Sequence, residues 1–383
     1  MNPFERLCPA PPTWSVRWPE IAAACPWLPG PAAERARPVV SALTGLDEFR
    51  GRPPEERVRI FTAALFLDAG RGADPPDDLP ASAALPVRAD AAFPVGVDAG
   101  FSVGVDAGFP VRADAGDGNV ARRGELVARR VLWEMGVPIA WREHVAALVR
   151  HQRLPFEALE RTDLDRVAFR VSLLARNDDL ALLALARGGA DEEVALFRQY
   201  TLEIGCWDGP RAFASDHARF EYFRTPGRDP GYAAFDDTRC TVTVMSGLPG
   251  SGKDHWIARN RPGVPVVSLD DLREKLGVRP TGDQGPVIAA ANARARELLR
   301  AGTAYVWNAT NVTRALRSRC IGLAAGYGAR VEVVSVEAPP DVVHRRNRAR
   351  ARTVPAAVID RMAGRWELPD PTEAHAVSWV DNA

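Results

Sequence analysis

The spacing of hydrophobic and polar positions changes near residue 240 and divides the chain into two parts. Before that point apolar residues recur at helical spacing, which predicts an all-helical region. After it, short apolar runs rich in β-branched residues alternate with helical segments, which predicts a parallel sheet with helical crossovers. We therefore expect an all-α domain over 1–204, a connector over 205–240 and an α/β domain over 241–383.

Ten segments carry this pattern most clearly. The expected helices of the first part are 32–46, 55–67, 121–135, 144–151, 164–176 and 192–204. The expected strands of the second part are 241–246, 264–268, 304–308 and 330–336. Because the strands alternate with helices, we expect right-handed crossovers and helices on both faces of the sheet.

Four tandem octads interrupt the helical region. They begin at Leu85, Phe93, Phe101 and Phe109. Their Pro and Gly residues disfavour a helix, so we expect a duplicated loop, disordered or loosely packed, within an insert at about 73–118. A calcium-binding repeat or a β-solenoid is the alternative, but the glycine and aspartate pattern of such repeats is absent.

The connector carries aromatic residues among turn residues. They are Trp207, Phe213, Phe220, Tyr222, Phe223, Tyr232 and Phe235. We expect these rings to pack against one or both domains, with substrate stacking as the alternative for some of them.

Composition excludes several classes of protein. The formal net charge is zero and the pI is about 7.0, so no global basic field indicates bulk binding of nucleic acid. The five cysteines are scattered, without the spacing of a disulfide framework or a metal site. We find neither a signal peptide nor an apolar run long enough to span a bilayer, and expect a cytoplasmic protein without a membrane partner.

The strongest motif is the segment 247–254, which fits G-x4-G-K after an expected strand and before an expected helix. Its glycines let backbone N–H groups converge on phosphate oxygens, and its lysine is one of only two in the chain. We expect ATP and Mg²⁺ as cofactors, although an ordinary glycine-rich turn is the alternative. The residues expected to hold the nucleotide are Gly247, Pro249, Gly250, Ser251, Gly252, Lys253 and Asp254.

Asp254 stands where this motif usually has a Ser or Thr that ligates magnesium. A carboxylate is also a hard oxygen ligand, so we expect Asp254 to be the metal ligand. Its negative charge close to a triphosphate would weaken nucleotide binding rather than change which nucleotide is bound.

A pair of carboxylates and an arginine follow the second expected strand. Asp270 and Asp271 come directly after it, and Arg273 is close behind. Strand ends of a parallel sheet lie beside the phosphate site, where a kinase needs a carboxylate near the acceptor hydroxyl. We assign Asp271 to the first turn of a helix, and Asp270 to function.

With these motifs, residues 242–361 resemble the 5′-polynucleotide kinase family, the end-healing P-loop kinases typified by the phage enzyme. The resemblance implies that Asp270 is the general base and that Lys253 and Arg350 act on the transferred phosphate. It implies that Arg273 contacts the acceptor strand's phosphate. After the third expected strand, we expect Asn308, Thr310 or Asn311 to hold magnesium-bound water or a substrate phosphate, with a polar turn as the alternative. The family often has a carboxylate where this chain has Ala309.

The segment 345–352 contains five arginines before a Val-Pro pair. We expect a helix on which Arg346 and Arg350 share one face, and the resemblance implies that these two close over the phosphates as a lid. A solvated basic helix is the alternative.

The segment 63–70 resembles the signature helix of HD-type phosphohydrolases, and 148–151 and 173–179 resemble later helices of that fold. Some bacterial RNA end-healing proteins join such a domain to a polynucleotide kinase. The family's histidine before Asp68 is replaced by Leu67, and no histidine precedes position 144. We therefore expect an inactive HD-like domain used for scaffolding or RNA docking, in which His151 is structural.

The sequence thus predicts an α/β P-loop kinase domain preceded by an all-α HD-like domain. Its expected activity is the transfer of phosphate from ATP to a 5′-hydroxyl end of nucleic acid, with RNA favoured. A kinase of a small molecule or nucleoside, or a non-catalytic ATP-regulated scaffold, is the alternative.

Overall fold

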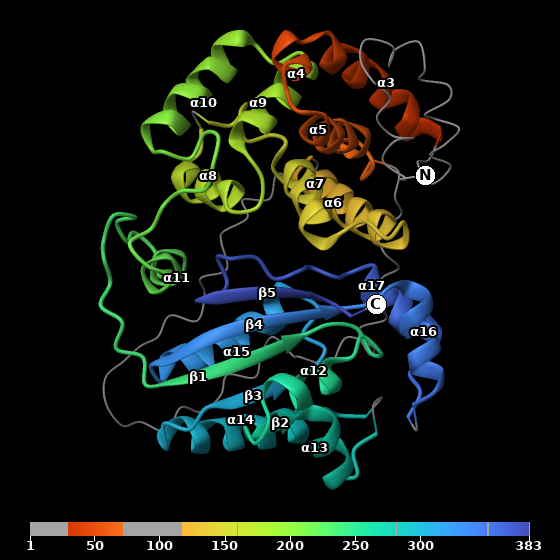
Figure 1. The fold of residues 1–383 in the computed structure, drawn as a ribbon, viewed down its shortest axis with the longest axis vertical. Helices are drawn as coiled ribbons and strands as arrows, with labels where there is room; N and C mark the ends of the chain where they lie inside the picture. Colours follow the sequence, from red (N-terminus) through yellow and green to blue (C-terminus); the bar gives the residue numbers. More distant parts are fainter. Residues whose placement is uncertain (1–29, 72–116, 159, 280–281, 351, 383) are drawn as a thin grey trace.

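The structure, a computed structural model, describes residues 30–71, 117–158, 160–279, 282–350 and 352–382. Figure 1 shows two parts, a group of helices above a twisted sheet with its own flanking helices. The four octads lie outside the described residues, so their expected loop structure stays a prediction.

The described part of the chain before residue 225 contains helices and no strand. Its helices are α3 (Gly30–Gly45), α4 (Asp47–Arg50), α5 (Pro54–Phe66), α6 (Asp117–Glu134), α7 (Ile139–His151), α8 (Leu164–Ser172), α9 (Asn177–Ala186), α10 (Asp191–Glu203) and α11 (Asp216–Arg224). They surround one apolar core, in which the C-terminal half of α5 is buried on all sides. None of the described helices has the length and hydropathy needed to span a bilayer.

Helix α11 and the segment before it join the two cores. Trp207, Phe213 and Tyr222 pack on the helical core, whereas Phe220 packs in the core of the sheet. Ser215 begins this helix by accepting a hydrogen bond from the N–H of Ala218 at 3.0 Å, as an N-cap serine does. The aromatic residues of α11 therefore contact both parts, as the packing interpretation of the sequence predicted. For Tyr232 and Phe235 that prediction is wrong, because their rings are 55 and 85% exposed.

The second part is built on five parallel strands in the order β2-β3-β1-β4-β5. The strands are β1 (Cys240–Ser246), β2 (Val266–Ser268), β3 (Tyr305–Asn308), β4 (Ala329–Glu337) and β5 (Ala376–Asp381). In register, Val244 of β1 faces Trp307 of β3 on one side and Val333 of β4 on the other. The predicted α/β architecture with a parallel sheet is confirmed.

Helices connect these strands and cover the sheet (Figure 1). They are α12 (Lys253–Asn260), α13 (Leu269–Lys275), α14 (Gly285–Arg300), α15 (Arg314–Gly326), α16 (Pro340–Arg348) and α17 (Ala356–Ala363). Because every strand runs in the same direction, the loops after the strands gather at one edge of the sheet, where a ligand site is expected.

Two boundaries differ from the prediction. The expected helix 164–176 ends at Ser172, and a separate helix, α9, begins at Asn177. The cause is Asn177, whose buried side chain donates to the carbonyl of Ala168 at 3.1 Å and so turns the chain. Strand β5 was not predicted, because its edge position leaves its residues half-exposed without a clear apolar run.

The two parts share a buried contact along α6 and α7. Arg142 of α7 is fully buried and its guanidinium lies 2.6 Å from the carboxylate of Glu337, the last residue of β4. Trp133 of α6 donates to the carbonyl of Ala338 at 3.1 Å and packs edge-on against Trp366. The helices are therefore docked against the strand that borders β1.

Candidate functional site

The loop between β1 and α12 has a backbone that requires glycine. Gly247, Gly250 and Gly252 have φ values of 143°, 86° and 100°. A Cβ on Gly247 would lie 2.3 Å from the carbonyl oxygen of Val336, and one on Gly250 would lie 2.6 Å from that of Val343. The glycines are thus required both for the turn and for its close packing on the neighbouring chain.

This loop delivers the chain into the first turn of α12, which begins at Lys253. Gly252 is the N-cap and provides no side chain to bond the first N–H groups of the helix. Such N–H groups and the helix dipole together make a site for an anion. Ser251 lies within the same turn, where its N–H donates to the carbonyl of Leu248 at 3.1 Å.

Lys253, the first residue of α12, is half-buried against the loop. Its ammonium donates to the carbonyls of Gly247 and Leu248, at 2.8 and 3.0 Å. Burial lowers the pKa of Lys253 to about 8, with the charges of Asp254 and Asp270 raising it and that of Arg350 lowering it. Three charged residues that the sequence assigned to the site therefore act electrostatically on this ammonium.

Asp254 lies at the start of α12 and faces the end of β3. Its carboxylate accepts a hydrogen bond from the amide of Asn308 at 2.7 Å, and both side chains are open to solvent. Mg²⁺ is usually bound by one or two protein carboxylates together with waters and phosphate oxygens. The carboxylate of Asp254 fits that donor set, and Asn308 presents its amide N–H to it. No group of three His, Cys, Asp or Glu side chains suited to a metal ion occurs among the described residues.

The residues after β2 form an acid–base pair at the same edge of the sheet. Ser268 caps α13 by accepting from the N–H of Asp271, and Asp270 follows it with 69% of its side chain exposed. Arg273 is fixed between the carboxylate of Asp270 and the side-chain oxygen of Gln284, which accepts at 2.7 Å. Asp270 thus stays accessible to solvent, and its carboxylate together with Gln284 fixes the orientation of the Arg273 guanidinium.

The segment after β3 is placed differently from the prediction. Thr310 is half-buried and its carbonyl accepts from the N–H of Gly247 at 2.8 Å. Asn311 is buried, has a φ of 43°, and donates from its side chain to the carbonyl of Met245 at 2.8 Å. Asn311 therefore holds the loop against β1. We correct the prediction that its side chain contacts the substrate.

The arginine-rich lid also departs from the expected continuous helix. Helix α16 ends at Arg348, because the side chain of Asn347 bonds both the carbonyl and the N–H of Val354, at 2.7 and 3.0 Å. Arg346 lies on the helix and Arg350 lies just beyond it, so the two do not share one helical face. Both are half-buried, and Arg350 acts on Lys253 through its charge.

Asn382 is a contact that sequence reasoning missed. Its amide donates to the carbonyl of Ser251 at 2.9 Å, and its carbonyl accepts from Arg346 at 2.8 Å. A Cβ on Gly252 would lie 1.9 Å from that amide nitrogen. No sequence pattern marks this asparagine, because the pairing of β5 with β4 brings it to the loop from 130 positions away.

The residues that resemble an HD site do not come together. Asp68 lines a cavity of about 300 Å³ near the end of α5, where it pairs with Arg71 at 3.0 Å and Arg187 at 3.4 Å. His151 lines a different cavity, between the two parts of the molecule. Two arginines thus lie beside the aspartate of the segment that resembles the HD signature helix.

Comparison with known families covers the second part of the chain. Residues 242–369 match a family described as an AAA domain. No curated protein matches the chain. Together with the loop geometry and the five-stranded parallel sheet, the match means that the C-terminal part is a P-loop nucleotide-binding domain of the kinase or ATPase type.

Proposed function

We propose that the protein is an ATP-dependent kinase that phosphorylates 5′-hydroxyl ends of nucleic acid, with RNA as the favoured acceptor. The observation that carries the proposal is the glycine-rich loop with Lys253 bonded to its carbonyls, together with the exposed Asp270 at the same edge of the sheet. Phosphoryl transfer requires backbone N–H groups that bind the phosphates, a carboxylate near the acceptor hydroxyl and a cation that stabilises the transferred group.

The nucleotide would bind with its phosphates on the glycine-rich loop and the N-terminus of α12. Lys253 would leave the loop carbonyls that it now contacts and turn toward the β- and γ-phosphates. Asp254 would hold Mg²⁺, which neutralises charge on the phosphates when it is bound, and Asn308 would orient that carboxylate. Arg346, next to the loop through its bond to Asn382, would contact the nucleotide from the other side.

The acceptor would approach from α13. Asp270 is exposed and can accept the proton of an incoming hydroxyl, while Arg273 can hold a phosphate of the same strand. Arg350 would stabilise the negative charge that develops on the transferred group. Thr310 remains a proposed substrate contact, whereas Asn311 is left out because its side chain is bonded to β1.

The helical part would act as a scaffold or docking module. Its buried pair Arg142–Glu337 fixes it to the strand beside β1, so it lies close to the nucleotide loop without contributing to the chemistry. Asp68 is neutralised by arginines and separated from His151, an arrangement that favours an inactive HD-like domain.

The test is a panel of acceptors incubated with labelled ATP and magnesium. We expect label on 5′-hydroxyl RNA, weaker label on DNA and none on free nucleosides. Label confined to small acceptors would replace the proposal with a small-molecule kinase. Nucleotide binding without transfer to any acceptor would replace it with an ATP-regulated scaffold.

A further inference from the structure

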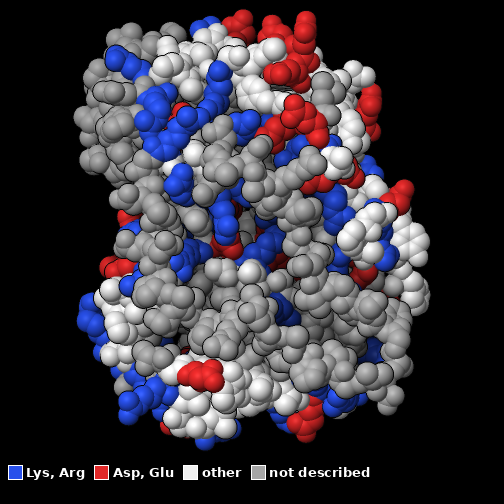
Figure 2. Space-filling model, turned by 180° about the vertical axis from the view of Figure 1, so that it is seen from behind, with Lys and Arg blue, Asp and Glu red and all other residues white. Residues whose placement is uncertain are grey.

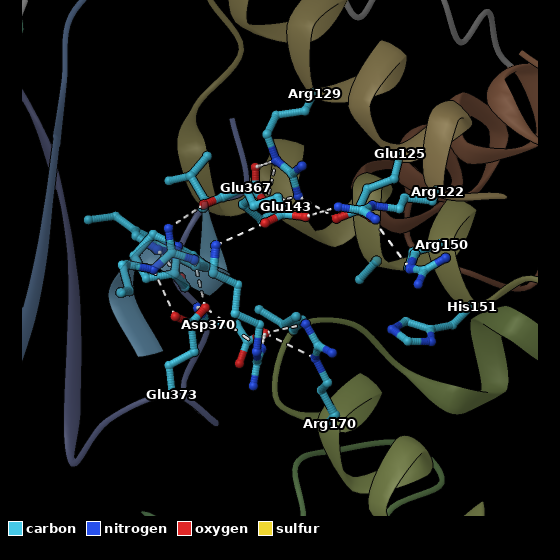
Figure 3. Close-up of a pocket in the computed structure, with 17 residues that line it drawn as sticks. Arg122, Glu125, Arg129, Glu143, Arg150, His151, Arg170, Glu367, Asp370 and Glu373 are labelled. Carbon is cyan, nitrogen blue, oxygen red and sulfur yellow. Dashed lines mark hydrogen bonds and ion pairs between the residues drawn. The ribbon is translucent and has the colours of Figure 1, made fainter. Parts of the chain in front are cut away.

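A cavity of about 150 Å³ lies between the two parts of the molecule, away from the glycine-rich loop. Helices α6, α7 and α8 line it on one side, and α15 with the segment 367–373 lines it on the other. Figure 3 shows Arg150, Arg170 and His151 pointing toward one open space within it. Figure 2 shows basic side chains gathered around a hollow in the middle of the back face, at the level where the two parts meet.

Six arginines and five carboxylates line this cavity, so its side chains carry an excess of one positive charge. Two of the arginines are fully paired in the interior: Arg129 with Glu143 at 2.7 Å, and Arg317 with Glu373 at 2.7 Å. The remaining four lie on the open side and share carboxylate partners, among them Glu367, which lies 2.9 Å from Arg122.

The sharing is uneven. Asp370 accepts from both Arg170 and Arg314, each at 2.7 Å. Glu125 lies 2.8 Å from the buried Arg129 but 3.6 Å from Arg150. Each cation on the open side therefore has a carboxylate beside it, and the lining as a whole keeps its excess of one positive charge.

Two lowered pKa values agree with this charge distribution. Burial lowers the pKa of Arg150, Glu125 offsets this in part, and the charge of Arg170 lowers it further. Burial also lowers the pKa of His151 well below its usual range, and Arg170 and Arg150 add to that effect. An anion that enters the cavity would relieve this repulsion.

We propose that the cavity binds a phosphate group, held by Arg150 and Arg170 together with Arg122 and His151. Guanidinium groups donate two parallel hydrogen bonds to phosphate, and such charge-assisted bonds are the strong ones. A neutral imidazole can donate one hydrogen bond more. The exposed fractions of Arg122, Arg150 and Arg170, 57, 34 and 30%, leave their guanidiniums within reach of a ligand from solvent.

The volume of the cavity limits the size of the ligand that it can hold. About 150 Å³ is enough for a phosphate and a few waters but small for a nucleoside, since pockets for such ligands measure several hundred Å³. The ligand is therefore free phosphate or the terminal phosphate of a larger ester, whose remainder would stay outside.

Such a ligand would tie the two parts of the molecule together. Arg122, Arg150 and Arg170 belong to the helical part, whereas Arg314 and Asp370 belong to the P-loop domain. Anything that binds only the folded protein raises its thermal stability by mass action, so phosphate should raise the melting temperature.

The test uses the full chain carrying Lys253→Met, so that phosphate contacts at the glycine-rich loop are weakened. Titration calorimetry with inorganic phosphate should give saturable binding with one site per chain. Arg150→Gln in the same background should weaken it about tenfold or more, since it removes charge-assisted hydrogen bonds. The matched control is Arg130→Gln on α6, because Arg130 pairs with Glu134 outside the cavity and should leave binding unchanged.

Arg122→Gln provides a second variant whose side chain is mostly exposed, so it reports on binding even if Arg150→Gln impairs folding. Glycerol phosphate and a 5′-phosphorylated oligonucleotide distinguish free phosphate from a phosphate ester as the ligand. If either ester binds more tightly than inorganic phosphate, the ligand is the terminal phosphate of a larger molecule. Absence of saturable binding, or binding that neither Arg150→Gln nor Arg122→Gln weakens, would overturn the proposal. The test does not require phosphate transfer, so it stands apart from that of the kinase activity.

Discussion

Aspartate pairs with arginine on two faces of the P-loop domain, and the two pairs are built in opposite ways. Asp270 has one arginine partner, Arg273, and 69% of its side chain is exposed. Asp370 has two partners and only 6% is exposed. Burial alone would raise the pKa of Asp370, but Arg170 and Arg314 outweigh it and hold that pKa far below its usual range.

The difference shows how the same residue types serve different purposes. A carboxylate that is buried between two guanidiniums stays ionised and joins the helical part to the sheet. Removing that carboxylate would leave two cations without their shared partner. A carboxylate that is exposed beside one guanidinium contributes little to stability and remains able to accept a proton from a ligand. The following experiments test this division between the nucleotide side and the interdomain side.

The largest effect is expected at the nucleotide side from Lys253→Met. Loss of the ammonium should lower phosphate transfer about a thousandfold, because a preorganised charge at the phosphates is removed. Transfer from labelled ATP and nucleotide affinity are the measurements. Lys275→Met is the control, since Lys275 is the only other lysine and lies exposed at the end of α13. Equal activity in both variants would show that the loop does not act on phosphates.

Asp270→Asn should lower transfer by about a hundredfold or more and leave nucleotide affinity unchanged, because it removes the proposed base without altering the loop. Asp271→Asn changes the adjacent exposed carboxylate and should keep nearly full activity. A variant Asp270→Asn with normal rates would refute the assignment of the acceptor side.

On the interdomain side, Arg142→Met should destabilise the fold by about 3 kcal/mol, since it leaves Glu337 buried without its partner. Urea unfolding measures the change. The double variant Arg142→Met with Glu337→Gln should recover part of the loss, because it removes the uncompensated charge. Arg130→Met, which breaks an exposed pair with Glu134, should cost no more than about 0.5 kcal/mol. Equal losses of unfolding free energy in all three variants would mean that burial does not decide how much an ion pair contributes to stability.

The smallest effect concerns His375, whose Nε2 lies 3.0 Å from Nδ1 of His217. Burial and the charges of Arg330 and His217 lower the pKa of His375 to about 4, against an opposing effect of Asp236. The folded state therefore resists protonation that the unfolded chain accepts below about pH 6.5. This stabilisation is complete above pH 6.5 and is lost as the pH falls toward 4.

Between pH 6.5 and 5, the free energy of unfolding should fall by roughly 1–2 kcal/mol in the native protein. In His375→Asn the fall should be smaller, because the titrating ring is gone while an amide oxygen can still accept from the N–H of Val331. Equilibrium unfolding at several pH values measures both. Parallel curves for the two proteins would contradict the lowered pKa.

The nucleotide side was more predictable from the sequence than the interdomain side, for a physical reason. The glycine-rich loop is local, so the residues that make it lie within eight positions and their φ values follow from glycine itself. The split between α8 and α9 was missed because the buried bond of Asn177 to Ala168 has no counterpart in apolar spacing. Contacts such as Arg142 with Glu337 join positions 195 apart, and only the packed fold brings them together.

Asn311 illustrates the limit of transferring roles by motif. Its position after β3 matched the expected substrate contact, yet its amide is used to hold the backbone of β1. Arg350 shows the reverse, because the helix expected to carry it ends two residues earlier, and the side chain still lies within electrostatic range of Lys253.

The position of Asn382 has a practical consequence for handling the protein. Its amide rests on the carbonyl of Ser251, so the backbone leaves β5 directly beside the glycine-rich loop. A purification tag fused after this residue would emerge next to the loop and crowd whatever enters it.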